Sequence, residues 1–190
     1  MTHALTPAQT VGPFFGVALF QSPMNVIAGS ANEGLPIRVE GRVLDGDGEG
    51  IPDAMVEIWQ ADARGHYHHP GHQLDENNGA FTGFGRSGTD DNGQYWFETI
   101  KPGAVASPSG GTQAPHLNVC VFARGLLDHL ATRIYFADEP SNETDEVLQA
   151  IEEARRPTMI AGRRAVDEVS VYEFDIVLQG DGETVFFDPR

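Results

Sequence analysis

The chain has 190 residues, of which 40% are apolar and 21% are charged, a composition typical of a folded globular protein and unlike that of a disordered one. Its 12 Lys and Arg residues against 28 Asp and Glu give a formal net charge of −16, which repels nucleic-acid phosphates and anionic membranes. Cys120 is the single cysteine, so an internal disulfide and a zinc site made of several cysteines are both excluded.

Glycine and proline are spread along the chain instead of being concentrated in one linker, which predicts a single domain over residues 1–190. Residues 1–35 are interpreted as an N-terminal arm and residues 37–188 as the core. No apolar run approaches the roughly 20 residues that cross a bilayer, and residues 1–20 lack the pattern of a secretory signal. We therefore expect a cytoplasmic protein with neither a membrane nor a nucleic acid as partner.

Alternation of apolar and polar residues predicts strands through most of the core. It begins at residues 37–43, and after a turn-rich stretch at 45–52 it resumes at 54–60, which predicts a hairpin. Further strands are expected at 95–100, 116–122, 133–136, 170–178 and 184–187. Strands separated by Gly and Pro turns, with little helix, indicate an all-β fold, an antiparallel β-sandwich.

Two segments depart from the strand pattern. Residues 64–93 have the composition of a loop, and a loop this long in a compact domain is usually functional or covers something. Residues 143–156 predict the one helix, because Ser141 or Asn142 can cap it and Pro157 ends it. Its charges suit the helix dipole, and we expect its apolar face to lie against the sheet or a partner.

Several short motifs occur along the chain in an order that resembles one enzyme family. They are Val56-Glu57-Ile58-Trp59-Gln60 with Gly65-His66-Tyr67, then Gly85-Arg86, Lys101-Pro102-Gly103 and Ala114-Pro115-His116-Leu117-Asn118. Together they resemble the intradiol ring-cleaving dioxygenases over residues 7–188. The resemblance implies a non-haem ferric ion held by two tyrosines and two histidines. A catechol bound there reacts with O2, and its ring opens between the two hydroxylated carbons.

The resemblance assigns four ligand positions, of which only two carry the expected residue. Tyr67 stands where the first tyrosine belongs, but Val105 stands at the second. The expected His-x-His pair, whose two side chains would share one face of a strand, is His116-Leu117-Asn118 here. We therefore expect a vestigial site at Tyr67, Val105, His116 and Asn118, with no bound metal and no catalytic residue in this chain alone.

The stretches Thr10-Val11-Gly12-Pro13-Phe14-Phe15 and Phe174-Asp175-Ile176 narrow the resemblance to the non-iron α chain of a two-chain member. This implies an iron-bearing β subunit as partner, Fe(III) in that partner only, and an aromatic carboxylate and O2 as substrates. Gly12, Pro13 and Arg133 then form part of the wall of the partner's cleft, where an arginine suits a carboxylate. The alternative for Arg133 is a structural ion pair.

Two other functions stay open. One is a β-sandwich assembly or binding module that has no role in a cleft. The other is an independent homo-oligomeric metalloenzyme that uses Tyr67, His116 and histidines of the long loop. Those histidines are His66, His68, His69 and His72, close enough in sequence to share a metal, although an exposed polar loop has the same composition. Tyr67 and His116 are equally compatible with buried polar residues that hydrogen-bond to partners.

Overall fold

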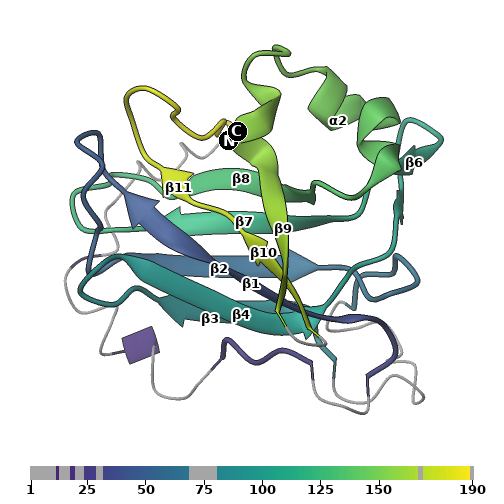
Figure 1. Cartoon of the computed structure of the whole chain (residues 1–190), viewed down its shortest axis with the longest axis horizontal. Coiled ribbons are helices and arrows are strands. Elements are labelled where there is room, and N and C mark those ends of the chain that lie inside the picture. Colours follow the sequence, from purple (N-terminus) through teal and green to yellow (C-terminus); the bar gives the residue numbers. More distant parts are fainter. Residues whose placement is uncertain are drawn as a thin grey trace, which may run out of the picture.

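The structure is a computed structural model, and it describes residues 12, 18–19, 24–28, 32–68, 81–166 and 169–188. Figure 1 shows two layers of strands with a helical segment at one end. The strands are β1 (Pro36–Leu44), β2 (Met55–Gln60), β3 (Phe84–Gly88), β4 (Gln94–Ile100), β5 (Val105–Ala106), β6 (Thr112–Gln113), β7 (His116–Phe122), β8 (Leu130–Phe136), β9 (Ile160–Val166), β10 (Val169–Glu173) and β11 (Ile176–Val177). Within these residues no helix has both the length and the apolar character needed to cross a bilayer.

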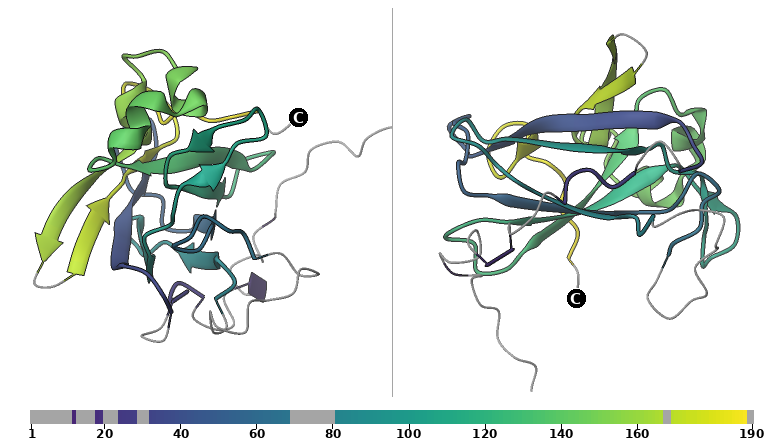
Figure 2. Two further views of the ribbon diagram at one scale, coloured as in Figure 1. Left: turned by 90° about the vertical axis from the view of Figure 1, so that its right-hand side faces the viewer. Right: turned by 90° about the horizontal axis from the view of Figure 1, so that it is seen from below.

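The two layers form one curled sheet, which confirms the predicted all-β sandwich. One layer has the order β3-β2-β7-β8 and the other contains β4, β1 and β10, while β9 joins them by pairing with both β8 and β10. The β9–β10 hairpin projects to one side of the molecule (Figure 2). The sheet is mixed rather than wholly antiparallel, because β1 runs parallel to β10 and β11, and β8 runs parallel to β9. A long crossover through the helical segment links β8 to β9, as parallel neighbours require.

The predicted hairpin between residues 37–43 and 54–60 is wrong, although both segments are strands. The residues at the two ends of the turn pair with each other, through an isolated bridge between Leu44 and Gly50. The chain then continues into β2, which pairs with β3 and β7 in the opposite layer. Both edges of β1 are already occupied, by β4 on one side and by β10 and β11 on the other. The turn therefore carries the chain between layers instead of pairing its two flanking strands.

The predicted helix over residues 143–156 is wrong in length. The segment consists of a 3-10 turn η2 (Pro140–Thr144), a short helix α2 (Glu146–Gln149) and a second 3-10 turn η3 (Arg156–Met159). Asp145 has extended backbone angles, φ −68° and ψ 119°, so it separates the first turn from α2. Its carboxylate also caps α2 by accepting from the backbone N–H of Leu148 at 2.8 Å. Leu148 is buried, so the apolar side of α2 does face inward as predicted.

Other boundaries differ from the prediction in smaller ways. The long excursion over residues 64–93 contains strand β3, which pairs with β2 although its sequence Phe-Gly-Arg-Ser-Gly has the composition of a loop. Strand β9 was not predicted. The expected strand at 170–178 is divided into β10 and β11, and at 184–187 only Phe187 forms a bridge, to Ala131.

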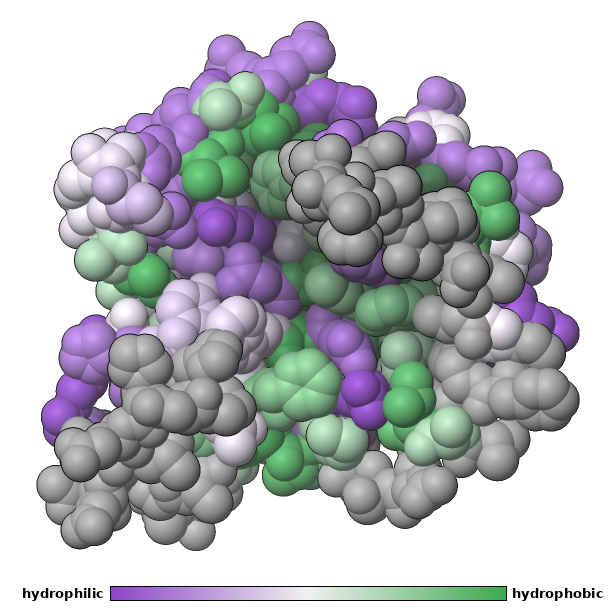
Figure 3. All heavy atoms as spheres, turned by 180° about the vertical axis from the view of Figure 1, so that it is seen from behind, coloured by the Kyte–Doolittle hydropathy of each residue, from purple (hydrophilic) through white to green (hydrophobic). Residues whose placement is uncertain are grey.

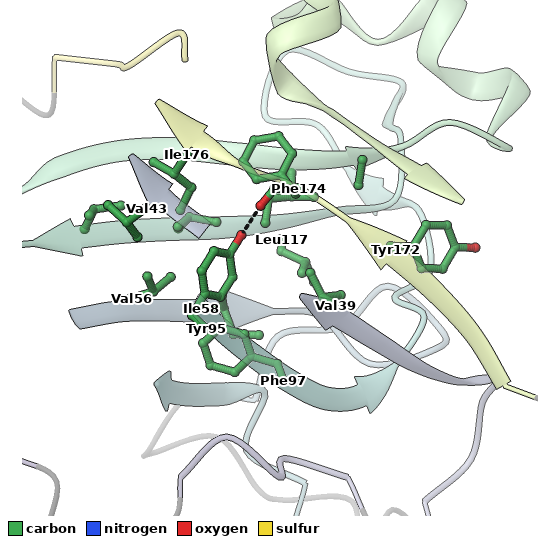
Figure 4. Close-up of a cluster of buried hydrophobic side chains, with 14 of the residues drawn as sticks. Val39, Val43, Val56, Ile58, Tyr95, Phe97, Leu117, Tyr172, Phe174 and Ile176 are labelled. Carbon is green, nitrogen blue, oxygen red and sulfur yellow. Dashed lines mark hydrogen bonds between the residues drawn. The ribbon is translucent and has the colours of Figure 1, made fainter. Parts of the chain in front are cut away.

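The core lies between the two layers, where alternate residues of facing strands meet (Figure 4). Val39 on β1, Ile58 on β2 and Leu117 on β7 are among its fully buried members. At the break between β10 and β11 the carbonyl of Phe174 accepts a hydrogen bond from the hydroxyl of Tyr95 at 2.6 Å. A Cβ on Gly41 would lie 1.8 Å from that carbonyl oxygen, so this crossing requires glycine. The core leaves the outer face of each layer to carry polar side chains.

Candidate functional site

The site lies on the outer face of the layer that contains β2, β7 and β8. Asn118 on β7 is opposite both Trp59 on β2 and Arg133 on β8, so these three residues form one row across the strands. His116 lies two residues before Asn118 and therefore shares its face. Leu117, between them, points into the core. The period of β7 and its register with β8 thus bring together His116, Asn118 and Arg133, three residues singled out in the sequence.

Tyr67 reaches this face from a turn after β2 that is organised by Asp62. The Asp62 carboxylate accepts hydrogen bonds from the backbone N–H groups of Arg64 and His66, at 2.9 and 3.0 Å. It also lies 2.9 Å from Nε2 of His68. Burial opposes ionisation of Asp62, but these hydrogen bonds outweigh it and hold the pKa below its usual value. The carboxylate thus stays charged and fixes the turn that presents Tyr67.

Gly65 makes this turn possible in two ways. Its φ of +83° lies in the left-handed region that disfavours residues with a side chain. A Cβ at this position would also lie 1.9 Å from the carbonyl oxygen of Ala104. The turn is therefore pressed against the segment that contains Val105, the other position at which the resemblance places a tyrosine.

Tyr67, His116 and Asn118 are joined by a chain of hydrogen bonds whose directions are fixed. His116 Nδ1 lies 2.7 Å from the carbonyl oxygen of Ala114, which can only accept, so Nδ1 carries the proton. In a neutral ring Nε2 then accepts, and the Tyr67 hydroxyl, 3.3 Å away, donates to it. Asn118 Nδ2 donates to the Tyr67 oxygen at 2.7 Å. The two retained ligand-type residues are therefore bonded to each other.

Arg133 closes the other end of this chain. Its Nε donates to Oδ1 of Asn118 at 3.2 Å, and its Nη1 donates to Oε1 of Gln113 at 3.2 Å and to the hydroxyl of Tyr135 at 3.3 Å. All three acceptors are neutral. The Tyr135 hydroxyl in turn donates to Asp145 at 3.0 Å, so the buried carboxylate of Asp145 is linked to Arg133 through one hydroxyl group.

The protonation states agree with this pattern. Burial, followed by the positive charge of Arg133, lowers the pKa of His116 to about 4, so the imidazole is neutral at pH 7. Burial raises the pKa of Tyr67, against the opposing effects of the Asn118 hydrogen bond and the Arg133 charge. The phenol therefore keeps the proton that it donates to His116. The site at neutral pH consists of neutral donors and acceptors around one guanidinium.

These residues do not fit a ferric ion. Two of the four expected donors are replaced, since the aliphatic side chain of Val105 cannot bind a metal and the Asn118 amide is committed on both its oxygen and its nitrogen. In the part of the chain that the structure describes, no group of three or more His, Cys, Asp or Glu residues could hold a metal ion. A guanidinium also lies beside the retained donors, where it repels a cation.

The remaining predicted site residues are placed as follows. Val105 is half-buried on β5 and pairs with Gln113 on β6, whose side chain accepts a hydrogen bond from Arg133. Gly12 has a φ of +77° in the N-terminal arm, and Pro13 lies outside the described residues. Of the loop histidines, His68 contacts Asp62 and His66 is exposed, while His69 and His72 lie outside the described residues. Where the structure describes this loop, its histidines do not join Tyr67 and His116.

Gln113, Tyr135 and Asp145 also belong to the site but were not predicted from the sequence. Tyr135 was within reach, because it lies two residues after Arg133 on the same strand and therefore on the same face. The sequence indicates Asp145 only as a residue at the start of a helix. Its carboxylate also accepts a hydrogen bond from the backbone N–H of Ala114 at 2.8 Å, and this contact joins residues 31 positions apart. Gln113 lies on the two-residue strand β6, which no periodicity reveals.

A cleft of about 450 Å³ lies in the other layer, away from this site. Charged side chains of β1 and β10 line it together with Trp96. Its cations are already occupied: Arg38 contacts Glu40 and the Trp96 ring, and Arg42 contacts Asp175. We assign no function to this cleft.

The fold and the site together define a class. The Dioxygenase family profile matches residues 12–180, and the chain belongs to the intradiol ring-cleavage dioxygenases, a family that uses non-haem Fe(III). The chain is 42% identical to the protocatechuate 3,4-dioxygenase alpha chain of Pseudomonas putida, in an alignment of 196 residues that covers 96% of each chain. It is 36% identical to the protocatechuate 3,4-dioxygenase beta chain of Burkholderia cepacia, over 84% of this chain and 71% of that one.

Solved structures of the same family support the fold. The dioxygenase domain of a dioxygenase–carbohydrate-binding fusion from Streptomyces sp. SirexAA-E is 27% identical, with a TM-score of 0.65 and coverage of 92% of this chain and 98% of that one. Catechol 1,2-dioxygenase from Acinetobacter sp. ADP1 is 26% identical, with a TM-score of 0.64, over 89% of this chain and 63% of that one.

Proposed function

We propose that the chain is the non-iron α subunit of a protocatechuate 3,4-dioxygenase. Paired with an iron-bearing β subunit, it takes part in cleaving protocatechuate with O2 between the two hydroxylated carbons, to give 3-carboxy-cis,cis-muconate. The observation that carries this proposal is the state of its own site, in which Tyr67 and His116 hydrogen-bond to each other and the residues that the structure describes offer no complete ligand set. Identity to alpha chains along almost the whole sequence supports the same assignment.

In this proposal Fe(III) belongs to the partner and supplies the ring-opening chemistry there. The chain described here contributes to the wall of the partner's cleft through Gly12 and Pro13 of the N-terminal arm, and through the positive charge of Arg133. The substrate's carboxylate is negative and the chain carries a net charge of −16, so a cation on the cleft side matters for binding.

Exposed apolar side chains support assembly with a partner. Large hydrophobic residues that are at least 40% exposed include Val26, Leu35, Trp59, Leu127 and Val169. Figure 3 shows hydrophobic residues interspersed with hydrophilic ones on one face of the molecule.

Co-expression tests the proposal. The chain should co-purify with a β-type chain that has both tyrosines and an intact His-x-His, as a stable hetero-oligomer with one iron per pair. That complex should consume one O2 per protocatechuate, whereas the chain alone should be colourless and inactive.

Two results would contradict the assignment. Separate migration of the two chains at micromolar concentration would favour an assembly or binding module with another partner. An iron-replete, coloured and active preparation of the lone chain would instead identify an independent metalloenzyme.

A further inference from the structure

Arg133 has an unusual environment for a cation in so acidic a protein. The chain has 28 acidic residues and 12 Lys and Arg, and most cations in the described part pair with a carboxylate, as Arg86 does with Glu57 and Lys101 with Glu139. The half-buried guanidinium of Arg133 contacts only amide and hydroxyl oxygens there. A charge held by neutral acceptors in this way points to a role for the charge itself.

The guanidinium sets the orientation of the Asn118 amide, and through it the direction of the hydrogen bond between Asn118 and Tyr67. It can only donate, so the Asn118 oxygen must face it, and the Asn118 nitrogen must therefore face Tyr67. The Tyr67 oxygen accepts that bond, and its own proton turns toward His116 Nε2. The donor-only guanidinium at one end and the acceptor-only Ala114 carbonyl at the other leave a single arrangement between them.

We propose that Arg133 replaces the metal as the positive charge of this site and, through Asn118, holds Tyr67 and His116 in a hydrogen-bonded pair that is closed to metal ions. This goes beyond the proposed function, which rests on the replacement of two ligands by Val105 and Asn118 and requires no role of Arg133 in excluding iron from this chain. Replacing those two side chains is then insufficient to restore a metal site as long as Arg133 remains.

Two physical effects keep a cation out. An incoming metal ion must displace the Tyr67 proton and break its hydrogen bond to His116 while it approaches a fixed like charge in a partly desolvated place. The buried carboxylate of Asp145 is also already linked to a cation, because the Tyr135 hydroxyl connects it to Arg133.

Iron titration of the full-length chain separates the two explanations. The double variant Val105→Tyr/Asn118→His supplies all four family ligands and keeps Arg133, and the triple variant adds Arg133→Gln. A matched control adds Arg42→Gln instead, which removes the same charge from a half-exposed arginine in the other layer. Each is incubated with Fe(III) and desalted, and iron per chain is read with the tyrosinate-to-iron absorption band.

The triple variant should bind about one iron per chain, whereas the double variant and the Arg42→Gln control should bind iron about 10- to 100-fold more weakly, the range typical of groups that surround metal ligands. A full equivalent of tightly bound iron in the double variant would overturn the proposal. So would a cooperatively melting triple variant that binds no better than the double. Failure of the chain to assemble with a β subunit would sink the proposed function but leave this titration unaffected.

A smaller change guards against misfolding caused by Val105→Tyr. Asn118→His alone gives Tyr67 and two imidazoles, and three protein ligands suffice for zinc. Zn(II) affinity, measured by competition with a chromophoric chelator, should be about 10- to 100-fold higher in Asn118→His/Arg133→Gln than in Asn118→His. Equal affinities would contradict a blocking role for Arg133.

Discussion

At position 118 a single amide connects a phenol to a guanidinium, and both of its polar atoms are needed. The Asn118 oxygen accepts from Arg133, while its nitrogen donates to Tyr67 and also lies 3.3 Å from the backbone carbonyl oxygen of Trp59. Asn118 stands where the family resemblance implies a histidine ligand, and here it is the centre of a hydrogen-bonded network.

Arg133→Ala in the complex with the β subunit tests whether the same charge also serves the substrate. Nε and Nη1 already donate within the chain, and Nη2 donates to none of the described residues. We therefore expect Arg133 to act on a substrate carboxylate mainly through its charge, worth about 1 kcal/mol, or roughly a 5-fold loss of kcat/KM for protocatechuate.

The loss should be selective for the carboxylated substrate. Catechol lacks the carboxylate, so its turnover should be nearly unchanged, and iron content should stay constant because the partner holds the metal. Steady-state kinetics with both substrates give the answer. Equal losses on the two would mean that Arg133 acts through the packing of this chain and not through its charge.

At the scale of elements, the turn that follows β2 decides where Tyr67 lies. Gly65→Ala would put a methyl group against the Ala104 carbonyl and force a residue with a side chain to adopt a φ of +83°. We expect a destabilisation of about 1–3 kcal/mol, the cost typical of a strained backbone position. Chemical denaturation measures it, and Arg64→Ala is the neighbouring control, because that side chain is exposed.

Loss of the turn should also be visible in the site. If the turn moves, the Tyr67 ring leaves Trp59, whose ring centroid lies 5.0 Å away, and the fluorescence of Trp59 should change. An alanine variant with unchanged stability and fluorescence would show that the turn can relax, and that glycine is not required there.

The prediction of strands and helices was correct where a local sequence pattern determines the element. It was wrong where a contact with a distant part of the chain determines it. Period-2 alternation located β1, β2, β4 and β7, because each buries one face. The helix over 143–156 was predicted too long. Asp145, which accepts hydrogen bonds from Ala114 and Tyr135 outside this segment, separates the first turn from α2, and α2 itself ends at Gln149. The hairpin after β1 failed because turn chemistry does not reveal whether a strand's edges are already taken.

The residues of the site likewise fall into those that the sequence indicated and those that depend on distant contacts. Tyr67, His116, Asn118 and Val105 were singled out by a family resemblance; the first three are hydrogen-bonded in one chain, and Val105 lies on the neighbouring strand β5. The resemblance placed Arg133 near a partner's cleft, but no local pattern placed it against Asn118. That contact follows from the register of β7 with β8, which pairs residues 15 positions apart and which the sequence does not specify.

At the scale of the whole molecule, acidic and basic side chains are distributed unevenly. The outer face of β1, β9 and β10 carries a network in which Arg164 contacts both Glu40 and Glu173, while Arg38 contacts Glu40 and Glu98. These pairs are half-exposed, and each contributes little to stability in salt. The buried titratable groups therefore control how stability depends on pH.

His116 should dominate this dependence between pH 6.5 and about 4. Its pKa in the native state, about 4, lies below the ordinary value of 6.5, so within this window the unfolded chain binds a proton that the native chain does not. Stability is fully present above pH 6.5 and falls as the pH is lowered, by about 3 kcal/mol at pH 4. The lowered pKa values of Asp62 and Asp138 affect stability only below their ordinary value of 3.8. They therefore contribute little to the change in stability between pH 6.5 and about 4.

Urea unfolding at several pH values between 4 and 7 measures the effect, with His116→Gln as the variant. Glutamine keeps a donor and an acceptor but does not titrate in this range, so the variant should be less stable than the native chain at pH 7 and lose much less stability on acidification. His129→Gln is the control, because it makes the same substitution at a histidine outside the hydrogen-bonded site, stacked on Phe122 with its side chain 35% exposed. If His116→Gln kept the full native slope, another buried group would have to carry the pH dependence, and the neutral imidazole inferred for the hydrogen-bonded site would be wrong.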